Sequence, residues 1–234
     1  MNTSKVNPYH FLKHWLMHAI AVWAVAAVAS LIAWIPVAIV ISVLGQYGIL
    51  FFLVNIISAI AVLAIPGAVI GYMIGDFQRN LVRDLLGWQL QNWIRGSIIG
   101  GVAGGVLVIV SMMLLGASLP ERIQWMLTMP LFILPISACQ WWILRTSTRE
   151  AWMWILGNVV GAIVFSALFF STQTMPFHLV EPLGDLLRWF LATGAMGVVT
   201  GVVMLWLYER PLTEFDDENA ELARVYVEVH TRDE

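Results

Sequence analysis

The chain has 234 residues, of which 60% are hydrophobic and 12% charged, with a formal net charge of −3 at pH 7 and a mean hydropathy of +0.82. A soluble domain usually carries about 25% charged residues, so the charges present could not cover a folded surface of this size. The composition therefore excludes an ordinary soluble domain. It indicates a membrane protein whose partner is the lipid bilayer and not nucleic acid.

Six segments are long and apolar enough to cross a bilayer as helices. A hydrocarbon core about 30 Å thick requires roughly 20 apolar residues in a helix, and none of the six has Asp, Glu, Lys or Arg in its interior. Spanning strands need only about 9–11 residues of alternating polarity, which these evenly apolar segments do not show. The predicted spans are 16–44, 48–75, 96–117, 125–144, 151–170 and 189–208. We therefore expect an all-α, polytopic transmembrane six-helix bundle.

The first segment is longer than one span requires. Its 29 residues would extend about 44 Å as a helix, beyond a core of about 30 Å, and Pro36 lies late in it. We expect a tilted or kinked helix, with a re-entrant turn after Pro36 as the alternative. The single cysteine, Cys139, lies in a predicted span, so no internal disulfide is expected.

The basic residues predict the orientation. Ten of the twelve Lys and Arg residues fall on one side of a six-span topology, and basic residues favour the cytoplasmic side. Both termini are therefore predicted to be cytoplasmic. The organisation is an N-terminal arm at 1–15, a six-span domain at 16–208 and a tail at 209–234. The tail has nine acidic and three basic residues, so we expect it to be solvated and repelled by anionic lipid.

An internal repeat joins two parts of the chain, at about 65–105 and 133–170. Both copies predict a helix, a cytoplasmic loop and a second helix in the same orientation, which makes them parallel repeats. A weaker echo at Trp206 and Arg210 suggests three related helix pairs, with the last span packing beside the first. The matching positions are Gln78, Arg83, Trp93, Gly96 and Gly100 in one copy and Gln140, Arg145, Trp154, Gly157 and Gly161 in the other.

Glycine and tryptophan patterns add two expectations. Glycines recur at every fourth position in several spans, as at Gly67, Gly71 and Gly75, and this spacing lets helix backbones approach closely. The contact is expected within the chain, with a homo-oligomer seam as the alternative. Most of the 12 tryptophans lie near predicted span ends, Trp15 and Trp93 among them, where anchoring at the membrane interface is the expected role.

These repeated residues resemble a group of uncharacterised bacterial multi-span membrane proteins. The resemblance rests on the pattern Gln-Trp-x2-Leu-Arg, then Trp-Ile and a glycine-spaced helix, and on the segment Gly197-Val-Val-Thr200-Gly201. It covers roughly residues 65–210, and the first copy departs from it because Arg79 follows Gln78. The resemblance implies a bacterial cytoplasmic membrane and a polytopic fold, and it carries no functional residues.

Polar residues within or beside the spans are the candidates for a site. No ionisable carboxylate or base lies deep in a span, which argues against a proton- or ion-coupled pump. Asn55 and Asn158 lie within spans, where an interhelical hydrogen bond is the ordinary role and a solute site the alternative. For the repeated residues at the predicted cytoplasmic rim, the expected role is to bind lipid phosphate or to cap helix ends. The alternative is that both arginines face one anionic ligand. This rim set is Gln78, Arg83, Gln140 and Arg145.

Three histidines share one predicted helix face. His10, His14 and His18 are spaced four residues apart, on a helix for which Asn7 and Pro8 supply a cap and a first turn. Such a face can ligate a metal or haem. No Cys, Asp or Glu lies nearby in the sequence to complete a site, so ordinary interfacial histidines are expected.

No catalytic motif is visible, and no enzyme activity or cofactor is expected. The first functional prediction is a structural or accessory subunit that packs with other membrane components or with copies of itself. The alternative is a permease for a small neutral solute, or a substrate-binding membrane subunit of a transporter. A pocket between the repeats lined by Asn55 or Asn158 favours the alternative, and a solidly filled bundle favours the first.

Overall fold

The computed structural model describes residues 7–44, 51–86, 90–115, 118–148, 150–171 and 181–209. In these ranges the chain forms α-helices and no β-strand, which confirms the all-α class. The helices are α1 (Pro8–Leu44), α2 (Phe51–Leu86), α3 (Leu90–Leu115), α4 (Glu121–Leu144), α5 (Trp152–Ser171) and α6 (Glu181–Tyr208). The tail from residue 210 onward lies outside the described residues.

Four helices in the described part of the chain are long and apolar enough to cross a membrane. They contain the segments Gln91–Leu115, Arg122–Leu144, Trp152–Phe170 and Gly184–Tyr208. The first two predicted spans fall in α1 and α2, where many side chains are outside the described residues. The count of six spans therefore stays a prediction.

Helix α1 is continuous through Pro36. Its start is capped as predicted, because the Asn7 side-chain oxygen accepts hydrogen bonds from the backbone N–H groups of Tyr9 and His10 at 3.1 and 3.3 Å. The helix then runs without interruption to Leu44, so the alternative of a re-entrant turn after Pro36 is wrong. Its 37 residues extend about 55 Å at 1.5 Å per residue.

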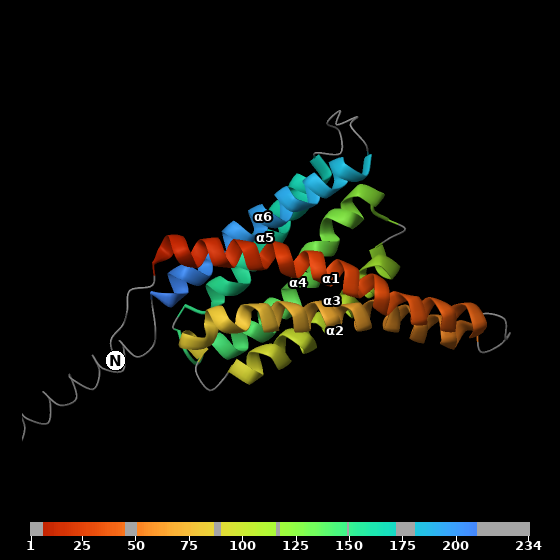
Figure 1. Cartoon of the computed structure of the whole chain (residues 1–234). Helices are drawn as coiled ribbons and strands as arrows, with labels where there is room; N and C mark the ends of the chain where they lie inside the picture. Colours follow the sequence, from red (N-terminus) through yellow and green to blue (C-terminus); the bar gives the residue numbers. More distant parts are fainter. Residues whose placement is uncertain are drawn as a thin grey trace, which may run out of the picture.

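Each helix packs against the next one in the chain, and α1 also packs against α6. Figure 1 shows α1 and α2 side by side, extending together beyond the other helices at one end. At the opposite end the chain brings together the start of α1 and the end of α6, with the end of α2, the start of α3, the end of α4 and the start of α5. The predicted contact between the last and the first helix is present.

Glycines allow these contacts by bringing helix backbones together. A Cβ on Gly67 of α2 would collide with the Gly101 carbonyl oxygen of α3, and a Cβ on Gly100 of α3 would lie 2.5 Å from Ile136 Cα of α4. A Cβ on Gly157 of α5 would lie 2.7 Å from Val203 of α6. A Cβ on Gly201 of α6 would meet α1 through Trp15 at the same distance. The predicted intramolecular use of the glycine spacing is confirmed.

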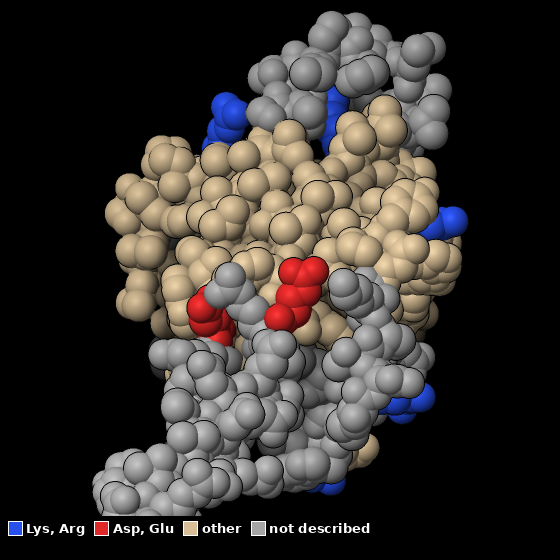
Figure 2. Space-filling view, turned by 90° about the vertical axis from the view of Figure 1, so that its left-hand side faces the viewer, with Lys and Arg blue, Asp and Glu red and all other residues tan. Residues whose placement is uncertain are grey.

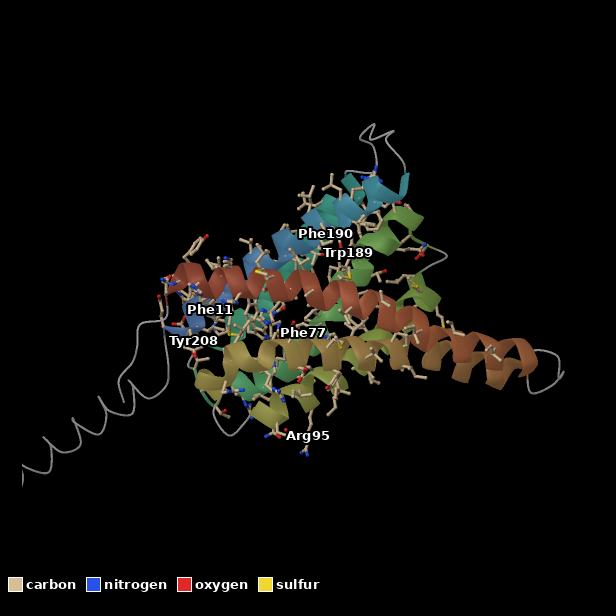
Figure 3. The ribbon with its side chains drawn as sticks, viewed as in Figure 1. Phe11, Phe77, Arg95, Trp189, Phe190 and Tyr208 are labelled. Atoms are coloured by element: carbon tan, nitrogen blue, oxygen red, sulfur yellow. The ribbon has the colours of Figure 1, made fainter. Side chains whose placement is uncertain are left out.

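The interior has two apolar clusters at different levels along the helices. The cluster nearer the end that carries Pro8 and Tyr208 is built on three buried indoles and on Phe11, which contacts Tyr208 (Figure 3). These indoles belong to Trp15, Trp93 and Trp154, which are at most 3% exposed. The anchoring role predicted for Trp15 and Trp93 is therefore wrong. The second cluster lies deeper and contains Val22, Ile74, Val108, Phe132, Ile133, Ile136, Ala162, Phe165, Ala192 and Met196.

Candidate functional site

A layer of polar side chains separates the two apolar clusters, and every helix contributes one residue to it. In sequence each of these residues falls between the members of the two clusters on its own helix. They lie four to ten residues, or about 6–15 Å, from the helix ends next to the indole cluster. The polar layer consists of His18, Gln78, Ser97, Gln140, Asn158 and Thr200, of which all but His18 and Gln78 are buried.

Gln140 is the centre of the layer. Its side chain is 1% exposed and makes three hydrogen bonds to three other helices. Its Nε2 donates to Gln78 Oε1 of α2 at 3.1 Å and to Ser97 Oγ of α3 at 2.8 Å. Its Oε1 accepts from Trp154 Nε1 of α5 at 2.9 Å. The amide is therefore fully satisfied, as a buried polar group in a membrane interior requires.

The chemistry of the indole fixes the direction of these hydrogen bonds. An indole N–H can only donate, so the atom of Gln140 that faces Trp154 is its carbonyl oxygen. The amide nitrogen of Gln140 then faces Gln78, and the atom of Gln78 that meets it is also a carbonyl oxygen. In the described part of the chain, neither N–H group of Gln78 Nε2 has a hydrogen-bond partner.

Two further hydrogen bonds involve residues of the layer, one between helices and one within a helix. Trp15 Nε1 of α1 donates to Thr200 Oγ1 of α6 at 3.1 Å, across the seam between the first and the last helix. Asn158 Nδ2 donates to the Trp154 carbonyl oxygen at 2.8 Å. This bond leaves the second N–H and the Oδ1 of Asn158 without a partner in the described part of the chain.

His18 presents an acceptor to the layer. Its Nδ1 lies 2.6 Å from the carbonyl oxygen of His14. A carbonyl oxygen can only accept, so Nδ1 carries the proton and Nε2 keeps a lone pair in the neutral imidazole. The ring packs edge-on against Phe77 of α2 with the centroids 6.0 Å apart, and Figure 3 labels Phe77 between α1 and α2.

A cavity of about 50 Å³ lies within this layer. One water molecule needs about 10–15 Å³ of such space, so the cavity has room for a few water molecules. Aromatic, small and aliphatic residues form the rest of the lining, among them Trp15, Phe77, Ala19 and Gly197. No Asp, Glu, Lys or Arg is among its described lining residues. The polar lining residues are His18, Gln78, Gln140, Asn158 and Thr200.

The repeat counterparts Trp93 and Trp154 differ in one respect. Both are fully buried and their ring centroids are 6.1 Å apart, yet Trp154 Nε1 has an acceptor and Trp93 Nε1 has none among the described residues. We expect Trp154→Phe to lower the free energy of unfolding by about 1 kcal/mol more than Trp93→Phe, because only the first leaves the Gln140 carbonyl without its donor. Both variants lose the same ring volume, so the packing loss cancels when their free energies of unfolding are compared. Unfolding of both in mixed detergent micelles checks this, and equal losses would contradict it.

The structure separates the four predicted rim residues. Gln78 and Gln140 are brought together inside the bundle. Arg83 and Arg145 have exposed side chains, and the guanidinium of Arg145 lies over the Trp142 ring, 3.2 Å from its centroid. Gln140 is therefore an interior residue and the two arginines are surface residues.

Other predicted candidates stay apart from the cavity. The rings of His10 and His14 lie 5.2 Å apart on the predicted common face, but both side chains are exposed. In the described ranges no group of three His, Cys, Asp or Glu residues could hold a metal ion. The Asn55 side chain lies outside the described residues.

Sequence reasoning missed Ser97 and the place of His18 in the cavity lining. A signal for Ser97 exists, because it follows Trp93 by four residues as Asn158 follows Trp154. Both side chains donate to the indole residue's carbonyl oxygen, at 2.8 Å in each case. His18 gives no comparable signal, since its role depends on the approach of α2.

The four long apolar helices of the described chain indicate an α-helical membrane protein. At the end next to the indole cluster, the described Lys and Arg side chains are exposed, and Figure 2, which faces this end, shows them at its edges. These exposed residues are Lys13, Arg79, Arg83, Arg95 and Arg145, and Figure 3 shows Arg95 pointing away from the bundle.

Comparison with protein-family models, curated proteins and solved structures finds no match to this chain.

Proposed function

We propose that this protein is a six-span membrane protein, with both termini in the cytoplasm, that binds a small neutral solute inside its bundle. The cavity in the polar layer is the observation that supports this proposal. It lies between the two repeated hairpins, since Gln78 comes from one copy and Gln140 and Asn158 from the other. A pocket between the repeats is expected of a solute-binding protein, whereas an accessory subunit is expected to have a solidly filled bundle.

The lining supports an uncharged ligand. A charged ligand in a membrane interior needs a counter-charge or a polar path, and the described lining offers only amides, a hydroxyl and an imidazole. The size supports a ligand of about four non-hydrogen atoms. Such a ligand gains at most about 1.5 kcal/mol per atom, which limits the dissociation constant to tens of micromolar at best. Binding is therefore expected between this limit and the millimolar range.

Saturation-transfer NMR of the protein in detergent micelles tests the proposal at these affinities. Acetamide, acetone and ethylene glycol represent neutral solutes, and acetate and methylammonium represent charged ones. We expect saturable transfer to at least one neutral solute, none to the charged ones, and a loss of about 1 kcal/mol or more in Asn158→Leu.

The control is Val160→Ala, which lies on the same helix and is 41% exposed. It should bind like the unchanged protein. Transfer to charged and neutral solutes alike, or no transfer to any of them, would contradict solute binding.

An accessory subunit is the second candidate, and the exposed face of α1 favours it. Apolar residues recur at alternating three- and four-residue steps along its outer half, the spacing of a helix-pairing seam. They are Val25, Val28, Ile32, Ile35 and Ile39, each at least 45% exposed. Native mass spectrometry after gentle extraction would show a co-purifying subunit or a second copy. A monomer with lipid alone would argue against this role.

A further inference from the structure

We propose that the ligand of the polar layer is a small primary amide, held with its carbonyl oxygen toward Gln78 and its N–H groups toward His18. This inference rests on the proposed function and names its ligand class. It follows from the donors and acceptors that the protein leaves unused around the cavity. The direction of the hydrogen bonds, fixed by Trp154, decides which atoms these are.

Two residues that line the cavity have N–H groups without a partner in the described part of the chain. Gln78 keeps the N–H groups of Nε2, because its carbonyl oxygen is bonded to Gln140. Asn158 keeps one N–H, because the other is bonded to the Trp154 carbonyl. Both residues line the cavity. The ligand must therefore offer an acceptor with two lone pairs, which a carbonyl oxygen does.

Two acceptor atoms without a partner in the described part of the chain complement them. In its neutral form His18 keeps the lone pair of Nε2, because Nδ1 donates to the His14 carbonyl. Asn158 keeps its Oδ1. Thr200 adds no donor, since its hydroxyl donates to a backbone carbonyl of its own helix, and its oxygen already accepts a hydrogen bond from Trp15. The ligand must therefore carry two donors as well.

A primary amide offers both kinds of group, because its carbonyl oxygen can accept two of the three unused N–H groups and its two N–H groups can donate to the unused acceptors. A ketone lacks the donors, and a single alcohol group has only one. A ligand that displaces water from such a site has to reproduce both kinds of hydrogen bond. The planar amide also suits the aromatic sides of the cavity, formed by Trp15 and Phe77, and a methyl group suits its apolar residues Val22 and Ile136.

Acetamide and acetone provide a matched test, because they differ only in that acetone has a methyl group where acetamide has its amino group. In saturation-transfer titrations we expect acetamide to bind about tenfold more tightly than acetone, the ratio that one net hydrogen bond produces. In His18→Phe, which keeps a ring beside Phe77 but has no acceptor, the ratio should fall severalfold, and the remaining preference should come from Asn158 Oδ1. In Gln78→Leu both ligands should weaken, since both use the carbonyl oxygen. The melting temperature of each variant confirms that it is folded.

The outcomes separate the two proposals. If neutral solutes bind but acetone or ethylene glycol equals acetamide, the amide assignment is wrong and solute binding stands. A preference for acetamide that His18→Phe leaves unchanged would also overturn the assignment. If no neutral solute binds, both proposals fail.

Discussion

Replacing Gln140 by leucine should lower the free energy of unfolding by about 2 kcal/mol. The substitution removes three hydrogen bonds to three helices at once, and interhelical hydrogen bonds in membrane proteins contribute about 0.6 kcal/mol each on average. It also leaves the Trp154 N–H buried without an acceptor, which adds to the loss. Leucine has a similar volume, so little of the effect should come from packing.

Unfolding in mixed micelles with increasing denaturing detergent measures this loss. Gln124→Leu is the matched control, because it makes the same change on the same helix, where the side chain donates to the Leu119 carbonyl at 2.7 Å near the helix start. We expect a smaller loss there. If the two variants lose the same stability, Gln140 does not hold the polar layer together.

Gly71→Ala should also destabilise the protein by about 2 kcal/mol. A Cβ at this position would collide with the Ser97 carbonyl oxygen of α3 and lie 3.0 Å from Ile98 Cα, and backbone atoms cannot move aside as a side chain can. Overpacking of this kind typically costs about 1–3 kcal/mol. Because Ser97 also receives a hydrogen bond from Gln140, the separation of α2 and α3 should weaken the polar layer as well.

Gly194→Ala is the control for this prediction. The nearest atom to a Cβ there is Leu16 Cδ1 at 4.0 Å, so there is space for the methyl group. Alanine favours helix over glycine by about 1 kcal/mol, so this variant should be neutral or slightly more stable. The same unfolding titration compares the two. If Gly71→Ala does not lower the free energy of unfolding, α2 and α3 do not approach as closely as described.

Much of the fold could be predicted from the sequence, because bilayer thickness and backbone hydrogen bonding leave few solutions for long apolar segments. The glycines at every fourth position correctly indicated close contacts within the chain. Asn7 correctly marked the start of α1, since its cap is a local interaction. These features depend on residues near each other in the sequence or on one property of a whole segment.

The site was harder to predict, because it depends on which helix faces meet. Trp15 and Trp93 lie near predicted span ends, where tryptophan usually anchors at the interface, yet glycines on neighbouring helices let large rings enter the interior. Gln78 and Gln140 matched as repeat positions, but their bond depends on the relative register of α2 and α4. The unused donors and acceptors follow only from the complete network.

The indole N–H signals of ¹⁵N-tryptophan-labelled protein test the central claim most directly. Trp15 lines the cavity, whereas Trp142 and Trp152 are 58% and 55% exposed and lie outside it. Single Trp→Phe variants assign the three signals. During an acetamide titration we predict a saturable shift of the Trp15 signal, with Trp142 and Trp152 unchanged. A shift that never saturates, or one that the exposed indoles share equally, would contradict a solute site in the polar layer.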